Sequence, residues 1–186
     1  NTSNVIYTLS ENIVSGYVAY YLKSITPGAG NSVYQLSGTE LQSGTNKSLL
    51  TPPTLTNDAI YTIVISGTDA AGNTGNATVT GITFTTTPPE FTGITPSTGS
   101  SVNSTNVAYT LNESITSGSV TFTRTGGAED SSPHVVTLSG KALNGGVHPY
   151  LSNLPTLVDG ATYTISFSGT DAAGNTGTTD VPSITF

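Results

Sequence analysis

Two acidic positions recur in both halves of this 186-residue chain, and they offer the clearest chemistry in its sequence. Glu113 follows Glu11 by 102 positions, and Asp171 follows Asp69 by the same number. No other acids among the 11 in the chain occupy matched positions. Carboxylate oxygens are the ligands of hard cations, and calcium takes about six to eight oxygen ligands. The repeated acids therefore predict a calcium site, provided that the fold brings them to one place.

The acids belong to a longer repeat. The heptapeptide Asp-Ala-Ala-Gly-Asn-Thr-Gly occurs at 69–75 and 171–177, and the segments at 4–11 and 106–113 match in the same register. Because the copies differ by no net insertion, the period is one whole domain and not a short solenoid turn. We expect a tandem array of two domains.

The elements that must position these residues are strands. Apolar residues alternate in short runs, such as Tyr61, Ile63 and Ile65, and Gly, Pro, Asn and Ser separate the runs. This pattern is typical of antiparallel strands joined by turns. No window carries a helical apolar stripe free of Gly and Pro, so we expect almost no helix. About seven strands in about 100 residues indicate an immunoglobulin-like sandwich.

A tyrosine follows a turn in each copy, Tyr61 after 55–60 and Tyr163 after 157–162. This is the arrangement of a tyrosine corner at the start of strand F. We expect each phenol to form a hydrogen bond with the backbone of its turn.

The two predicted domains span 1–84 and 85–186, and 85–105 supplies the linker and strand A of the second domain. Nothing before Asn4 corresponds to that segment, so the first domain is expected to be N-terminally incomplete. Either the sequence begins inside a domain, which we favour, or a segment from elsewhere adds to the open sheet edge. Two consecutive prolines, Pro88 and Pro89, predict an extended and stiff linker.

Composition excludes several classes of function. The chain has no cysteine, its charged residues make up 8%, and its net charge is −7. Few charges and many Ser, Thr, Asn and Gly favour an extracellular protein, and the lack of a basic stripe argues against a nucleic-acid partner. No apolar run is long enough for a membrane span. The two histidines occur only in the second copy, so no repeated Ser-His-Asp arrangement exists and we expect no enzyme.

Three features carry a family resemblance: Ser-Glu or Asn-Glu after strand B, the tyrosine corner, and Gly-Thr-Asp-Ala-Ala-Gly-Asn between strands F and G. Over its whole length the chain resembles the tandem bacterial immunoglobulin-like domains of large repetitive surface adhesins and related cell-surface proteins. The resemblance implies an all-β fold of two immunoglobulin-like β-sandwich domains and an extracellular or cell-surface location. It also implies a structural spacer that adjoins further domains of the same kind, held in line in some such families by calcium.

In an immunoglobulin-like sandwich the B–C loop, the F–G loop and the start of strand A share one pole. The predicted metal ligands at that pole are Glu90, Glu113, Asp171 and Asn175 in the second copy, and Glu11, Asp69 and Asn73 in the first copy. Calcium is the favoured ion. The alternative is that Asp and Asn only stabilise the hairpin by bonding the local backbone. Both alternatives stay open at this point.

The copies differ most between strands C and E, where the first copy carries Tyr17 and Tyr21. Alternation turns Val18 and Tyr20 inward, so Tyr17 and Tyr21 are expected to face outward. Two aromatic side chains on one face could bind a cell-surface glycan or protein, which would make the chain an adhesion module. They could equally be ordinary surface tyrosines with good strand propensity.

Overall fold

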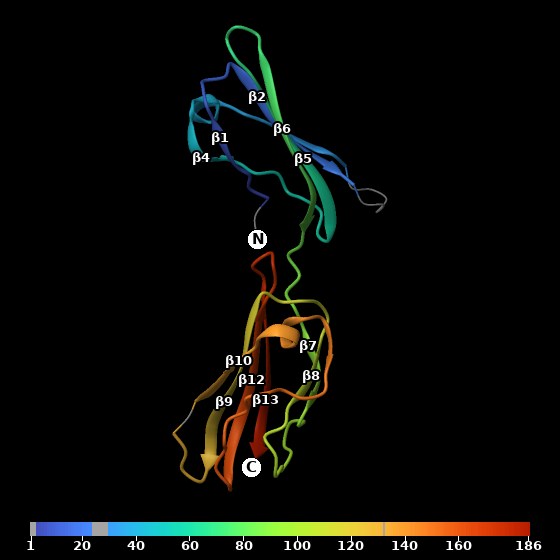
Figure 1. The fold of residues 1–186 in the computed structure, drawn as a ribbon, viewed down its shortest axis with the longest axis vertical. Helices are drawn as coiled ribbons and strands as arrows, with labels where there is room; N and C mark the ends of the chain where they lie inside the picture. The colour runs from blue at the N-terminus through green and yellow to red at the C-terminus, as the bar shows by residue number, and fades with distance from the viewer. Residues whose placement is uncertain (1–2, 24–29, 132) are drawn as a thin grey trace. The chain divides into compact units, whose positions relative to one another are not determined.

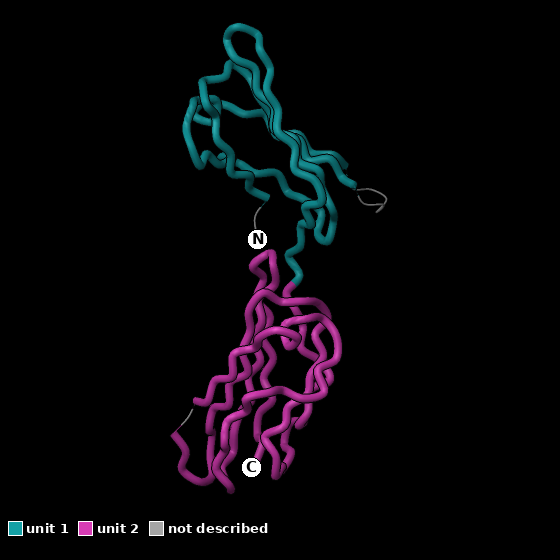
Figure 2. Tube along the Cα trace, in the orientation of Figure 1, with its two compact units in different colours: residues 1–87 teal, residues 88–186 magenta. Residues whose placement is uncertain are grey.

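The computed structural model describes residues 3–23, 30–131 and 133–186. The chain divides into two compact units, Asn1–Thr87 (unit 1) and Pro88–Phe186 (unit 2), which Figure 2 shows in separate colours. Apart from two short 3-10 turns, η1 (Gly38–Leu41) and η2 (Gly140–Leu143), the described regular elements are all strands. The predictions of an all-β fold with almost no helix are therefore confirmed. None of the described elements is a helix long and apolar enough to cross a membrane.

Unit 2 is a sandwich of two antiparallel sheets (Figure 1). One sheet has the order β11-β8-β7, made of β7 (Phe91–Thr95), β8 (Ala108–Leu111) and β11 (Gly146–His148). The other has the order β10-β9-β12-β13, made of β9 (Ser117–Gly127), β10 (His134–Thr137), β12 (Ala161–Thr170) and β13 (Thr176–Thr185). This is the immunoglobulin-like arrangement, with β7 as strand A, β8 as strand B and the β12–β13 hairpin as strands F and G.

The core of unit 2 follows from alternation along its strands. Every second residue of β12 is buried, beginning at Ala161, and the residues between are half-buried. Three aromatic rings from three different strands meet in this core. The ring centroid of Phe91 lies 5.7 Å from that of Tyr109 and 5.4 Å from that of Phe167. Strand β7 is thus joined to both sheets by packing as well as by hydrogen bonds.

Unit 1 repeats this plan with one difference. One sheet has the order β3-β2-β5-β6, made of β2 (Ser15–Leu22), β3 (Ser32–Gln35), β5 (Ala59–Thr68) and β6 (Thr74–Phe84). The other contains only β1 (Ile6–Leu9) and β4 (Gly44–Ser48). In the part of unit 1 that the structure describes, no strand corresponds to β7, so β1 has a partner along one edge only.

Both tyrosine corners are present. The Tyr61 hydroxyl accepts a hydrogen bond from the Thr56 amide at 2.9 Å, and the Tyr163 hydroxyl accepts one from the Val158 amide at 3.0 Å. Both phenols are buried to 1% exposure or less. The predicted bond from each phenol to the backbone of its turn is confirmed.

Candidate functional site

The segment that leads into β7 is part of the folded body of unit 2. Pro89 is buried, and a methyl group on Gly177 would collide with the Pro89 carbonyl oxygen. The Glu90 amide donates to the Asn112 side-chain oxygen at 2.8 Å, and the Asn112 amide donates back to the Glu90 carbonyl oxygen at 3.3 Å. Because Glu113 follows Asn112 directly, the backbone segments that carry Glu90 and Glu113 are neighbours.

The B–C turn also contacts the F–G hairpin. The Thr116 hydroxyl donates to the carbonyl oxygens of Thr170 and Asp171, at 3.0 and 3.1 Å. The Thr116 amide donates to the same Thr170 oxygen at 2.7 Å. Three segments that are distant in sequence therefore meet at one pole of unit 2, which is the geometry on which the predicted cation site depends.

Asp171 organises the hairpin between β12 and β13. Its Oδ1 accepts hydrogen bonds from the amides of Ala173 and Asn175, both at 2.8 Å, and its Oδ2 accepts one from the Asn175 side-chain nitrogen at 2.8 Å. Asp171 is 4% exposed. Unit 1 repeats these bonds from the amides of Ala71 and Asn73 and from the Asn73 side chain to Asp69, at 2.8, 2.8 and 2.9 Å.

Both aspartates are held as carboxylates. Burial raises the pKa of Asp171, but hydrogen bonds from Asn175, Ala173 and Gly174 outweigh burial and leave the pKa below its usual value. The side chain and backbone of Asn73 lower the pKa of Asp69 in the same way. The hairpin thus supplies its own charge-assisted donors, as the alternative without a metal requires.

Two of the predicted ligands of unit 2, Asp171 and Asn175, are in direct contact. Glu113 is half-buried and Glu90 is exposed. Among residues 3–23, 30–131 and 133–186, no three acidic or histidine side chains are grouped closely enough to hold a metal. Calcium binding therefore stays a prediction.

The corresponding predicted ligands of unit 1 are arranged in a similar way. Asp69 and Asn73 are in contact, and Glu11 is exposed.

The two tyrosines of the predicted adhesion face lie on β2, in the middle of a four-stranded sheet. Tyr21 is 41% exposed and pairs with Thr62 of β5, and Tyr17 is half-buried opposite Gln35 of β3. Part of the variable segment that follows β2, residues 24–29, lies outside the described residues.

Sequence reasoning missed a buried carboxylate in unit 1, Glu40, which is 2% exposed. Its Oε1 accepts hydrogen bonds from the Tyr34 hydroxyl at 2.8 Å and the Leu50 amide at 2.7 Å. Its Oε2 accepts bonds from the amide and hydroxyl of Ser37, at 2.9 and 3.4 Å. The pair Ser37-x-x-Glu40 is a capping box, and this local pattern was the signal in the sequence.

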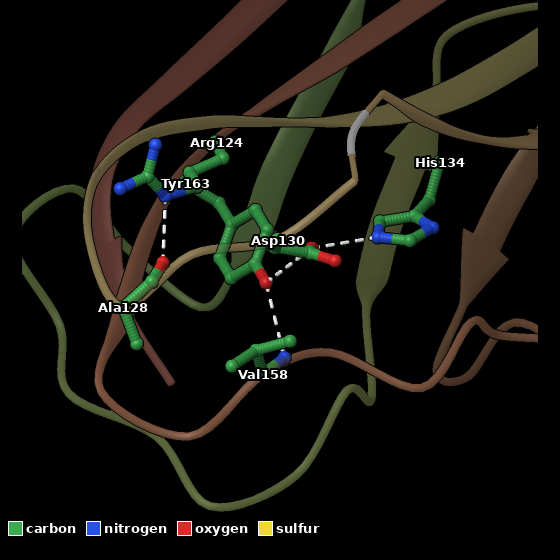
Figure 3. A network of polar contacts seen from close by, with 6 residues as sticks. All are labelled: Arg124, Ala128, Asp130, His134, Val158 and Tyr163. Atoms are coloured by element: carbon green, nitrogen blue, oxygen red, sulfur yellow. Dashed lines mark hydrogen bonds and ion pairs between the residues drawn. The ribbon is translucent and has the colours of Figure 1, made fainter.

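A second polar network, in unit 2, was also missed (Figure 3). The Tyr163 hydroxyl donates to Asp130 Oδ2 at 2.6 Å, and His134 Nε2 lies 2.7 Å from the same oxygen. The hydrogen bond from Tyr163, which has the larger effect, and the one with His134 both lower the pKa of Asp130. Nearby, the Arg124 Nε donates to the Ala128 carbonyl oxygen at 2.6 Å. The network ties the loop between β9 and β10 to the tyrosine corner, which is a structural role.

A solved structure and a sequence-family model match this chain. One of the matching solved structures is described as "Structural insight into host cell surface retention of a 1.5-MDa bacterial ice-binding adhesin"; it is 18% identical, with a TM-score of 0.29. The alignment covers 98% of this chain and 58% of the adhesin chain, so this chain spans little more than half the length of that protein's chain. None of the curated proteins matches. A sequence model of the bacterial Ig-like domain (group 3) matches residues 77–183, more than half of the chain. The chain therefore belongs to the bacterial immunoglobulin-like domain family.

Proposed function

We propose that this chain is a structural spacer of a bacterial cell-surface or extracellular protein, in which successive sandwich domains set reach and stiffness. Membership of a family of non-enzymatic immunoglobulin-like domains supports this role. The observation that carries the proposal concerns the linker. Its first residues form hydrogen bonds with unit 1, and its last residues form hydrogen bonds with unit 2.

On the side of unit 1, the Asn57 side chain holds the linker. Its nitrogen donates to the Thr87 hydroxyl at 2.8 Å, and its oxygen accepts from the Thr86 hydroxyl at 2.9 Å. On the side of unit 2, Pro89 is buried and Glu90 is paired with Asn112. Few backbone torsions are left free between these anchors, and the prolines fix φ at two of the positions. This supports a stiff connection between neighbouring domains.

Small-angle X-ray scattering tests the spacer role. The unchanged chain is expected to give a narrow distribution of interatomic distances. A variant with Pro88→Gly and Pro89→Gly is expected to give a broader one, because glycine frees φ at both positions. A control variant with Pro52→Gly and Pro53→Gly, two prolines outside the linker, should keep the narrow distribution. An equally broad distribution for the unchanged chain and the linker variant would refute the stiff spacer.

A finer proposal is that calcium stiffens the domain pole, bound through Glu90, Glu113, Asp171 and Asn175. The meeting of their segments and the ionised Asp171 support it. The test is calorimetry in chelator and then in calcium up to about 10 mM, which covers the weak affinities of extracellular calcium modules. Glu113→Gln is the variant to use, because substitution of Asp171 would also break the hairpin.

A saturable rise in the unfolding temperature of unit 2 that disappears in Glu113→Gln is the expected result. Glu129→Gln, which changes an exposed acid outside the predicted set, should keep the rise. A flat response would refute the calcium site and leave a metal-free spacer whose hairpins are stabilised by their own hydrogen bonds.

Exposure of Tyr21 favours one second candidate, an adhesion module that binds glycan or protein through the C-to-E face of unit 1. Binding to a glycan array that is lost in a variant with Tyr17→Ser and Tyr21→Ser would support this function. Binding that survives both changes would exclude this face.

A further inference from the structure

Unit 1 contains an apolar groove. The groove has a volume of about 700 Å³ and lies between β1 and β6. Its walls include Tyr7, Leu9, Ile65, Gly67 and Val79. The repeat of 102 residues allows each wall residue to be compared with its counterpart in unit 2.

In unit 2 the corresponding space is filled by the ring of Phe91. A methyl group on Gly169 would lie 3.0 Å from this ring, and the ring also packs on Tyr109 and Phe167. Gly169 is the counterpart of Gly67, where the three atoms nearest to an added methyl group all belong to Ile13. No described side chain of unit 1 stands where Phe91 stands in unit 2.

The exposure of matched residues differs accordingly. Val79 is 54% exposed and its counterpart Val181 is 6% exposed. Ile82 is 38% exposed and its counterpart Ile184 is 2% exposed. The counterparts of Ile63, Ile65 and Val79 in unit 2 are apolar as well. The groove of unit 1 is therefore lined by a core-type apolar face that no described strand covers.

The backbone edges on both sides of the groove are also open. In unit 2, β7 pairs with β8 through Phe91 opposite Leu111, and Val102 donates to the Thr185 carbonyl oxygen of β13 at 2.8 Å. The segment that contains β7 thus bridges the edges of the two sheets. In the described part of unit 1, β1 pairs only with β4 and β6 pairs only with β5.

A glycine lies at one end of the groove in unit 1, and its counterpart in unit 2 contacts the chain that leads into β7. Gly177 is packed against the Pro89 backbone, whereas a methyl group on its counterpart Gly75 would have no atom within 4 Å. Both units therefore have a glycine at the point where the incoming chain passes, and only in unit 2 is that chain present among the described residues.

We propose that this groove is the docking site of an extended strand with the chemistry of Pro89–Thr95, which completes the core of unit 1. The strand runs antiparallel to β1, places an aromatic or large aliphatic side chain over Gly67, and places a proline carbonyl at Gly75. In unit 2 the equivalent strand, β7, precedes β8 in the chain, so the occupant that fits is a strand connected ahead of β1. The inference does not depend on the spacer function or on calcium.

The test is to supply the strand in the same register. A copy of residues 85–105 is fused directly to Asn4, which is the counterpart of Asn106. The unfolding transition of unit 1 is expected to rise by about 5 °C or more, the scale expected for one well-packed side chain in a domain of this size. Amides of β1 should gain protection from hydrogen exchange, and the transition of unit 2 should stay in place.

The matched control carries Phe91→Ser and Ile94→Ser in the added copy only. It keeps the length and backbone of the added strand and loses its apolar side chains, so it should give little stabilisation. No rise with the native copy, or an equal rise with the serine copy, would overturn the proposal. Sedimentation of the unfused chain gives an independent check: a dimer that dissociates on fusion would identify the occupant as a second copy, and this too would overturn it.

Discussion

Replacement of Glu40 by glutamine tests whether a buried carboxylate holds one end of unit 1 together. The change keeps the shape of the side chain and removes its charge. In the native unit both oxygens only accept, from the Tyr34 hydroxyl, the Leu50 amide, and the amide and hydroxyl of Ser37. The hydroxyls can rotate to accept from a glutamine NH₂ group, but neither backbone amide can.

The expected cost follows from this count. Whichever way the glutamine amide is oriented, one part-buried backbone N–H group, that of Ser37 or that of Leu50, faces its NH₂ group and loses an acceptor. A hydrogen bond to a charged group contributes about 1.5–3 kcal/mol, and an unsatisfied buried donor costs about 1–3 kcal/mol. We therefore expect a loss of about 2–3 kcal/mol, which for a domain of this size lowers the unfolding temperature by about 10–20 °C.

The effect should depend on pH. Burial raises the pKa of Glu40, but its hydrogen bonds from Leu50, Ser37 and Tyr34 outweigh burial and leave it below its ordinary value of 4.5. A carboxylate with a lowered pKa stabilises the folded state above its unfolded pKa and loses that contribution as the pH falls through the folded pKa. The difference between the native chain and Glu40→Gln should therefore be full at neutral pH and shrink below about pH 4.5.

Differential scanning calorimetry is the appropriate assay, because each of the two units can unfold in its own transition. Glu11→Gln is the control, since it removes an exposed acid from the same unit and should change stability by less than about 0.5 kcal/mol. If Glu40→Gln shifts the unit 1 transition no more than Glu11→Gln does, the hydrogen-bond account of this carboxylate is wrong.

Two further pairs of variants use the repeat as an internal control in the same assay. Gly177→Ala should destabilise unit 2 by about 3 kcal/mol because its methyl group meets the Pro89 backbone, whereas Gly75→Ala, with open space, should stay within about 0.5 kcal/mol; equal effects would contradict the packing. Tyr61→Phe should cost about 1 kcal/mol for one lost backbone hydrogen bond. Tyr163→Phe should destabilise unit 2 by more, because the Tyr163 hydroxyl also donates to the Asp130 carboxylate. This additional loss of stability should decrease at acid pH, as the pH falls through the lowered pKa of Asp130. An excess that does not change with pH would show that the carboxylate bond is not its source.

Much of the fold could be predicted because its signals are local. Alternation with period two specifies strands, and the repeated turn chemistry specifies where the strands end. The tyrosine corners were predictable for the same reason, since Tyr61 bonds to Thr56 only five residues away. The Asp171 hairpin is equally local, because its three bonds come from residues two and four positions on.

The polar networks and the candidate ligands were harder to predict, because the burial and direction of their side chains depend on tertiary packing. Glu40 belongs to a local capping box, yet its burial depends on Tyr34 and Leu50 as well as on Ser37. Hydrogen bonds bring the backbone segments that carry the predicted calcium ligands of unit 2 to one pole. These contacts do not fix the direction of the ligand side chains. Sequence spacing specifies which strand a residue occupies, and long-range packing decides which side chains meet.

The groove of unit 1 separates the two sources of information. By itself the sequence determined that both copies build the same sandwich, with matched apolar residues such as Val79 and Val181 on the same face. Only the tertiary structure decided that Val181 is buried and Val79 is not, because burial requires a strand from a distant part of the chain to cover that face. Periodicity creates an apolar surface, but whether the surface becomes a core or a docking site depends on what packs against it.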